Sequence, residues 1–159
     1  MSANEEFVIQ RARSSDSWTS FVDLTREYLS ELDQNYRFRS MHNLFADPTG
    51  GVDLEQGVAL LGLLGTEVAG VIGLRPLDDR VGELKRLFVR PAYRGRGLGT
   101  LLCYAAISHA KQRGYQAVRL DTTTRLGPAV RLYKGLGFHE IGAYNGNPER
   151  DARFFELNL

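Results

Sequence analysis

The segment from Arg94 to Gly99 has glycine at positions 95, 97 and 99 and arginine at 94 and 96. Without side chains at the glycines, successive backbone N–H groups can converge on one phosphate, and a helix that begins there adds positive potential. The arginine side chains can neutralise further charge on the anion. The segment therefore predicts a phosphate-binding site. The alternative is a flexible glycine loop with solvated arginines.

Two other phosphate motifs can be compared with these residues. A P-loop needs Gly-Lys followed by Ser or Thr, and the chain has no such triplet. The dinucleotide fingerprint needs glycine at its first, third and sixth positions, but the sixth position counted from Gly95 is Thr100. Asp121 does lie at the end of the next expected strand, where a ribose-binding acid would sit. A dinucleotide site therefore stays open as an alternative.

The elements that must position this segment follow from hydrophobic periodicity and turn residues. A strand over residues 82–90 is expected to end at Pro91, and a helix over 98–113 is closed by Gly114. Further strands are expected at 7–12, 58–64, 68–74, 117–120, 138–144 and 153–159, further helices at 15–31 and 127–137, and a loop with one short helix at 33–56. This order predicts a mixed sheet with helices on its faces, an α+β or layered α/β architecture.

Length and composition limit the class of protein. The chain has 159 residues, 43% of them hydrophobic, so we expect a single domain over 1–159 with its core at about 7–159. A net charge of +1 argues against a general nucleic-acid binder. The single Cys103 excludes an internal disulfide, and the histidines lack metal-ligand spacing, so no metal is expected.

The apolar runs of the chain are all short. None approaches the roughly 20 residues that a membrane-spanning helix needs, and the first residues are polar and acidic rather than a targeting segment. We therefore expect a cytoplasmic protein without a membrane partner. A homodimer stays open.

A second motif follows at residues 132–138, Leu-Tyr-Lys-Gly-Leu-Gly-Phe. Arg94–Gly99 matches the signature Arg/Gln-x-x-Gly-x-Gly/Ala, and with residues 132–138 in the same order and spacing the chain resembles the GNAT superfamily of acetyl-CoA-dependent N-acetyltransferases. The resemblance covers residues 7–159 and is more specific than one glycine loop would be. It implies a mostly antiparallel sheet of six to seven strands, flanked by helices, with a splayed strand pair that binds coenzyme A.

The resemblance also implies how acetyl-CoA, the cosubstrate, is bound. Backbone N–H groups would hold the pyrophosphate along Arg94, Gly95, Arg96, Gly97, Leu98, Gly99 and Thr100. The backbone of Leu87 and Val89 would bind the pantetheine arm, since an amide-rich chain can add to an exposed strand edge. The N–H near Val89 is the expected oxyanion donor. Leu126 stands where many members have an asparagine that contacts the cofactor, so that contact is not expected.

Tyr133 aligns with a family tyrosine near the sulfur that acts as general acid. Its ordinary pKa of about 10 keeps it protonated at neutral pH and able to donate. The alternative is that Tyr133 only packs, together with Ala129 and Leu136 on one face of its helix.

Glu83 aligns with a strand glutamate that deprotonates the amine through water in some family members. Period-two alternation is expected to place Glu83, Lys85, Leu87 and Val89 on one face of the strand, toward the thioester. The alternative is an ion pair between Glu83 and its basic neighbours.

The acceptor is expected to enter opposite coenzyme A, between the first helix, the irregular stretch and the closing hairpin. The candidates are Tyr28, Tyr36, Arg37, Tyr144 and Asn147. Aromatic and arginine side chains would suit the primary amine of a small molecule that bears a carboxylate or a ring. Acetylation of a protein N-terminus or lysine, and a non-catalytic acyl-CoA sensor, are the alternatives.

Overall fold

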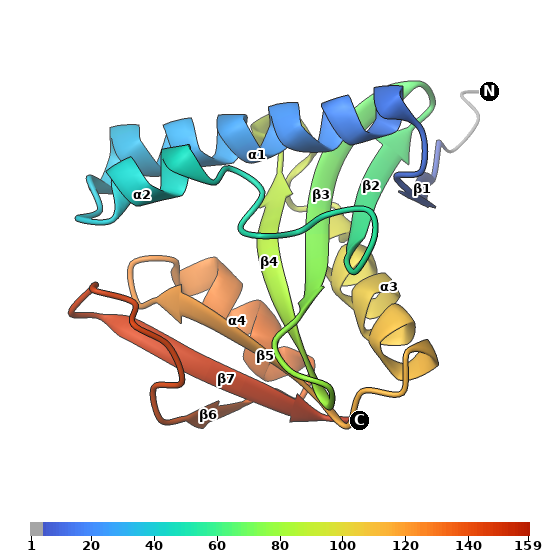
Figure 1. The fold of residues 1–159 in the computed structure, drawn as a ribbon. Coiled ribbons are helices and arrows are strands. Elements are labelled where there is room, and N and C mark those ends of the chain that lie inside the picture. The colour runs from blue at the N-terminus through green and yellow to red at the C-terminus, as the bar shows by residue number, and fades with distance from the viewer. Residues whose placement is uncertain (1–4) are drawn as a thin grey trace.

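The computed structural model describes residues 5–159, which form a seven-stranded sheet with helices on both faces (Figure 1). The strands are β1 (Phe7–Arg11), β2 (Val58–Leu64), β3 (Glu67–Pro76), β4 (Val81–Val89), β5 (Ala117–Thr123), β6 (His139–Ile141) and β7 (Ala152–Asn158). The helices are α1 (Ser15–Tyr36), α2 (Met41–Ala46), α3 (Leu98–Gln112) and α4 (Gly127–Gly135), with a 3-10 turn η1 (Pro91–Tyr93).

The order of the strands in the sheet is β1-β2-β3-β4-β5-β7-β6. Within the described residues every neighbouring pair is antiparallel except β4 and β5. The predicted layered α+β fold with a mostly antiparallel sheet is therefore confirmed. A dinucleotide-binding fold needs an open, mostly parallel sheet, so that alternative from the sequence is excluded.

Strands β4 and β5 pair briefly and then diverge. Their pairing runs from Val81 opposite Ala117 to Glu83 opposite Arg119. Beyond this stretch β5 continues beside β7 and β4 continues beside β3, so the two strands open into a wedge (Figure 1). In residues 5–159, no strand neighbours the edge of β4 that faces the wedge. This is the splayed strand pair that the resemblance implied.

A β-bulge lies in β4 on the wall of this wedge. Phe88 is opposite Val71 and Lys85 is opposite Gly73, so two residues of β4 face a single residue of β3 between them. One of the two is Arg86, which has a left-handed φ of 60°.

The bulge changes which face of the sheet the side chains of β4 occupy. Leu84 lies in the core beneath α3, and Leu87 packs against that same core, whereas Phe88 lies in the core beneath α1. The prediction that one face holds Glu83, Lys85, Leu87 and Val89 is therefore wrong. An extra residue in the strand reverses the alternation for the residues that follow it.

Each face of the sheet is covered by one long helix. The buried residues Leu98, Leu102 and Ala106 of α3 recur every four positions and pack on one face. Helix α1 covers the other face with Phe21 and Leu24. No helix in residues 5–159 combines the length and the apolar character that a membrane crossing needs.

Two of the boundaries that differ from the predicted ones concern the acceptor residues of the site. Helix α1 continues to Tyr36, so this tyrosine belongs to the helix and not to the irregular stretch after it. Strand β6 is only three residues long, and residues 142–151, here called the closing loop, connect it to β7. The loop lies beside the wedge between β4 and β5, where its side chains contact the site.

Candidate active site

The loop between β4 and α3 forms a cradle of backbone donors. Gly95 and Gly97 have left-handed φ angles of 75° and 84°, which other residues adopt only with strain. No backbone carbonyl of residues 5–159 accepts a hydrogen bond from the N–H groups of residues 95–100. Because the first N–H groups of a helix have no partner within it, these groups are free to bind an anion.

The arginines of the cradle have partners of their own. The Nη2 group of Arg94 donates to both carboxylate oxygens of Glu31 at 2.8 Å, and its Nε donates to the Val89 carbonyl. The Arg96 guanidinium lies over the ring of Phe7, 5.0 Å from its centre. Arg94 thus fastens the cradle to α1. Contacts of either side chain with a phosphate stay a prediction.

A groove of about 360 Å³ begins at the cradle, and we call it the long groove. It passes the end of β4 and reaches α4 at Leu126 and Ala129. The predicted cofactor residues that line it are Leu87, Val89, Arg94, Gly95, Gly97, Leu98 and Gly99, whereas Arg96 and Thr100 do not. The long groove therefore joins the glycine loop to the unpaired edge of β4.

The last residues of β4 present backbone groups to the wedge. The N–H of Arg90 donates to the Ala69 carbonyl at 2.8 Å, toward β3. Since successive residues of a strand direct their N–H groups to opposite edges, the N–H of Val89 is directed to the wedge. This places a donor that has no backbone partner in residues 5–159 at the mouth of the gap between the splayed strands.

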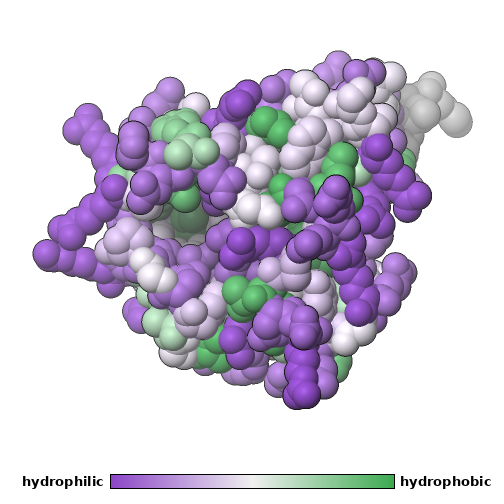
Figure 2. Space-filling model, viewed as in Figure 1, coloured by the Kyte–Doolittle hydropathy of each residue, from purple (hydrophilic) through white to green (hydrophobic). Residues whose placement is uncertain are grey.

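A second space of about 130 Å³, the small cavity, lies between β4, β5, α2 and the closing loop. Tyr28, Leu87 and Ala129 line both spaces, so the long groove and the small cavity meet at the splayed strands. Figure 2 shows a hollow with a hydrophobic floor and hydrophilic residues around it between the helical end and the β5–β7 end of the molecule.

Tyr133 stands in the wall of the small cavity. Its side chain is 8% exposed, and its ring packs edge-on against Phe138. Burial raises the pKa of the hydroxyl well above its ordinary value, and no group in residues 5–159 hydrogen-bonds to it. The hydroxyl therefore remains protonated at the cavity and keeps its proton available for donation.

Glu83 is buried and bonded through both of its oxygens. Oε1 accepts from Arg75 Nε at 2.8 Å and Oε2 accepts from the Tyr144 hydroxyl at 2.6 Å. Lys85 Nζ lies 3.7 Å from Oε1. Burial and the hydrogen bond to Glu83 raise the pKa of Tyr144, so Tyr144 stays a donor. Glu83 does not line the small cavity, and an amine would reach it only through water or one of these partners.

Asp121 is the carboxylate of β5 that lines the small cavity. Lys85 Nζ lies 3.6 Å from it, and Asn147 and Asn145 donate side-chain amide bonds of 2.9 and 3.2 Å. Burial alone would raise the pKa of Asp121, but Lys85 and the two amides outweigh burial and lower it. Asp121 is therefore ionised, and it holds the closing loop against β5.

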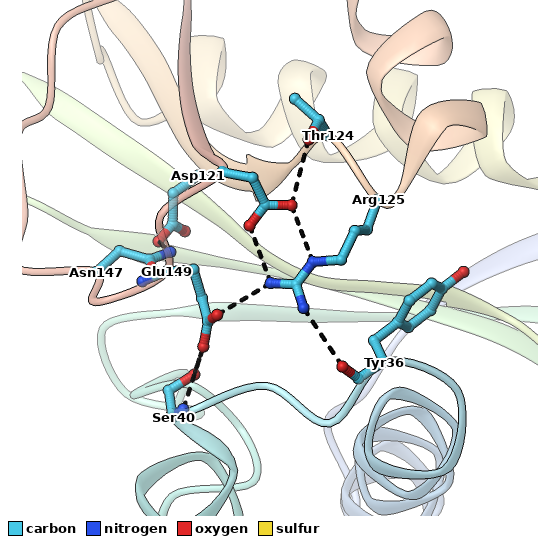
Figure 3. A network of polar contacts seen from close by, with 8 residues as sticks. Tyr36, Ser40, Asp121, Thr124, Arg125, Asn147 and Glu149 are labelled. Carbon is cyan, nitrogen blue, oxygen red and sulfur yellow. Dashed lines mark hydrogen bonds and ion pairs between the residues drawn. The ribbon is translucent and has the colours of Figure 1, made fainter.

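Arg125, between β5 and α4, connects three segments (Figure 3). Its guanidinium donates to Asp151 and Glu149 at 2.9 Å and to the Tyr36 carbonyl at 3.3 Å. Glu149 also accepts from the backbone N–H of Ser40 at 3.2 Å. The end of α1 and the start of α2 are thereby joined to the closing loop along one side of the small cavity.

Replacing Arg125 with glutamine should weaken this junction in a pH-dependent manner. The hydrogen bond from Arg125 is the main cause of the lowered pKa of Asp151; for Glu149, burial alone would raise the pKa, but bonds from Arg125 and Ser40 lower it. A carboxyl with a lowered folded pKa stabilises the fold above its unfolded pKa, and this stabilisation is lost as pH falls through the folded value.

We therefore expect Arg125→Gln to lower the free energy of unfolding by about 1 kcal/mol at pH 7. The difference from wild type should narrow below pH of about 4. Urea unfolding at both pH values measures this. The control is Arg153→Gln, which removes an exposed pair with Glu140 and should change stability little. A pH-independent difference at Arg125 would contradict the linkage.

The predicted acceptor residues do not all lie in one space of the structure. Asn147 lines the small cavity, Tyr28 lines both spaces, and Tyr36 lines the long groove. Tyr144 bonds Glu83 instead, and Arg37 is exposed at the end of α1 and lines neither space. The polar residues around the small cavity that were not among the predicted site residues are Ser40, Lys85, Arg86, Asp121, Thr122, Thr123, Arg125 and Glu149. Of these, strand alternation placed Lys85 on the face toward the thioester, and Asp121 was considered as the acid of a dinucleotide site.

Comparison with known proteins agrees with this geometry. Residues 18–138 match the Acetyltransferase (GNAT) family. An uncharacterized N-acetyltransferase of Schizosaccharomyces pombe is 34% identical over 142 residues, which cover 87% of this chain and 86% of that protein.

Solved structures share the fold. A GNAT family acetyltransferase from Staphylococcus aureus Mu50 superposes with a TM-score of 0.76 at 23% identity, over 97% of this chain and 99% of that one. A GNAT family acetyltransferase from Elizabethkingia anophelis, solved with acetyl-CoA bound, has a TM-score of 0.68 at 16% identity, over 99% and 100% of the two chains.

Proposed function

Because the chain belongs to the GNAT family of acetyltransferases, we propose that it transfers the acetyl group of acetyl-CoA to the primary amine of a small molecule. The observation that carries the proposal is the junction between the long groove and the small cavity at the splayed strands. A donor in the groove and an acceptor in the cavity would meet beside Leu87 and Ala129. The volume of the small cavity, about 130 Å³, favours a small amine over a protein segment.

The residues present fit acetyl-CoA. The free N–H groups of residues 95–100 would hold its pyrophosphate, as helix N-termini hold phosphates. The unpaired edge of β4 at Leu87 and Val89 would pair with the amides of the pantetheine arm. The related Elizabethkingia anophelis structure, which has acetyl-CoA bound, supports this use of the groove.

The proposed reaction is direct attack of the amine in a ternary complex. The amine nitrogen forms a bond to the acetyl carbon while the N–H of Val89 stabilises the developing oxyanion. The carbon–sulfur bond then breaks, and the Tyr133 hydroxyl donates its proton to the thiolate. The nitrogen loses one proton through water to a base. The return of a proton from that base through solvent to the Tyr133 phenolate then restores both groups for the next turnover.

Glu83 is the proposed acceptor of the amine proton through an intervening water. Each of its oxygens accepts one hydrogen bond, from Arg75 and from Tyr144, and a carboxylate oxygen can accept a second one from water. The pH dependence of kcat/KM in Glu83→Gln tests the role. A profile that keeps the shape of wild type would assign Glu83 to the ion-pair network alone.

Release of coenzyme A across a panel of amines tests the proposed function. We expect acetyl-CoA to lose its acetyl group faster with at least one small primary amine than with buffer. Faster release with lysine peptides or with peptide N-termini than with any small amine would favour a protein substrate. Tight binding of acetyl-CoA without turnover on any acceptor would indicate an acyl-CoA sensor instead.

A further inference from the structure

Two cations line the small cavity, and they differ in their partners. Lys85 lies between Asp121 and Glu83, at 3.6 and 3.7 Å. Arg86 has no carboxylate within the 4.0 Å of an ion pair in residues 5–159. An arginine is charged at every relevant pH, and a charge removed from water is costly without a counter-charge. The half-buried Arg86 therefore leaves a positive charge at the cavity without an ion-pair partner in the described chain.

The Arg86 guanidinium is nevertheless held in place. Nε donates to the Pro48 carbonyl at 2.8 Å, and Nη2 donates to the Asp47 carbonyl at 3.1 Å. A Cβ added to Gly50 would lie 3.2 Å from Cζ, so the loop before β2 packs closely on the guanidinium. The bonds to the two carbonyls use only part of the five donor hydrogens. A fixed guanidinium with spare donors is suited to bind a carboxylate without loss of further freedom.

The backbone conformation at Arg86 gives a second reason to assign a role to its side chain. A non-glycine residue at a φ of 60° is strained by about 1–2 kcal/mol relative to glycine. Glycine would suit the bulge better, so a role of the side chain is the simplest physical reason for an arginine there. Its contacts with the carbonyls of residues 47 and 48 and its position at the cavity are the two roles that the structure offers.

The charged side chains that line the small cavity suit an acceptor that carries both a positive and a negative group. Asp121 lines the cavity as an ionised carboxylate and can attract an ammonium group. Glu149, the other carboxylate of the cavity, is paired with Arg125 at 2.9 Å. Arg86 thus supplies the unpaired cation, and Tyr28 and Phe38 supply aromatic walls.

We propose that the acceptor amine also carries a carboxylate, so that it is a small amino acid, and that Arg86 binds this carboxylate in the small cavity. The inference rests on the proposed acetyl transfer and specifies its substrate class. Arg86 acts as a specificity-determining residue, and the acid–base groups stay those of the proposed reaction.

The test compares an amino acid with its own neutral analogues. Alanine, alaninamide and ethylamine serve as acceptors for wild type, Arg86→Met and Arg86→Lys, with coenzyme A release as the signal. Wild type should prefer alanine, and Arg86→Met should raise KM for alanine about 10- to 100-fold with a smaller change in kcat, as for a lost charge-assisted hydrogen bond. KM for the amide and for ethylamine should change less than about twofold, and Arg86→Lys should recover part of the loss.

A second readout does not depend on turnover. Binding of N-acetylalanine, measured by calorimetry in the presence of coenzyme A, should weaken in Arg86→Met and persist in the surface control Arg153→Met. If Arg86→Met raised KM for alanine and for ethylamine equally, Arg86 would serve only to hold the loop of residues 47–50 in place. This result would overturn the inference. Turnover of neutral amines without preference for alanine overturns it as well, whereas no turnover of any amine contradicts the acetyl transfer itself.

Discussion

Tyr133→Phe is expected to lower kcat about 100-fold or more, because it removes the proton proposed for the thiolate leaving group. The substitution deletes one oxygen that has no partner in residues 5–159 and keeps the ring that packs on Phe138. The fold should therefore be unchanged. Coenzyme A release under saturating amine and acetyl-CoA measures the effect, and thermal unfolding verifies that the variant is folded.

The raised pKa of Tyr133 also predicts how the activity of the wild-type protein depends on pH. Burial raises the pKa of this hydroxyl well above its ordinary value, so the protonated, donating form persists into alkaline solution. Activity should not fall through ionisation of Tyr133 near pH 9. Tyr104→Phe is the matched control, since Tyr104 is exposed on α3 and should leave kcat unchanged. A Tyr133→Phe variant as fast as wild type would assign this tyrosine to packing alone.

Gly97→Ala should raise KM for acetyl-CoA about tenfold or more. Gly97 has a φ of 84°, where a Cβ costs about 1–2 kcal/mol, and relief of that strain would turn the N–H groups of the cradle away from one another. Apart from its two chain neighbours, no atom of residues 5–159 lies within 4 Å of the added methyl group, so a clash is not the cause. Initial rates against acetyl-CoA concentration measure the change.

Gly99→Ala is the matched control for this cradle. Gly99 lies inside α3, is absent from the left-handed glycines, and its added Cβ would meet only Leu132 at 3.4 Å, an ordinary contact. Its KM for acetyl-CoA should stay within about threefold of wild type, because helical alanine is unstrained. Equal effects of the two substitutions would show that backbone conformation at Gly97 does not decide cofactor binding.

The cradle and the element order could be predicted because their signals are local. Glycines at alternate positions, Pro91 after a strand and Gly114 after a helix each act within a few residues, through steric limits on the backbone. The hydrophobic alternation and helical periodicity then predict the layers of the fold. The same local rule failed in β4, because the bulge at Arg86 is defined by its register with β3.

The small cavity could not be predicted in this way, because its contacts join distant positions. Ser40 and Glu149 are 109 positions apart, and Asp121 and Asn147 are 26 apart. An arginine that binds a partner across the fold has the same sequence pattern as one that is solvated. Arg37 and Arg125 illustrate this, since the first is exposed and the second joins three segments.

The amino-acid sequence by itself determined the family, and it predicted the glycine loop at residues 94–99 and the tyrosine at 133 as site residues, because these depend on residue types at fixed short spacings. Only the tertiary structure decided that both oxygens of Glu83 are bonded, that Asp121 lines the small cavity, and that Arg86 lies there without a carboxylate partner in residues 5–159. The physical reason is that charge pairing and burial depend on which strands and loops contact one another across the sheet. The bulge in β4 and the divergence of β4 from β5 determine these contacts at the site.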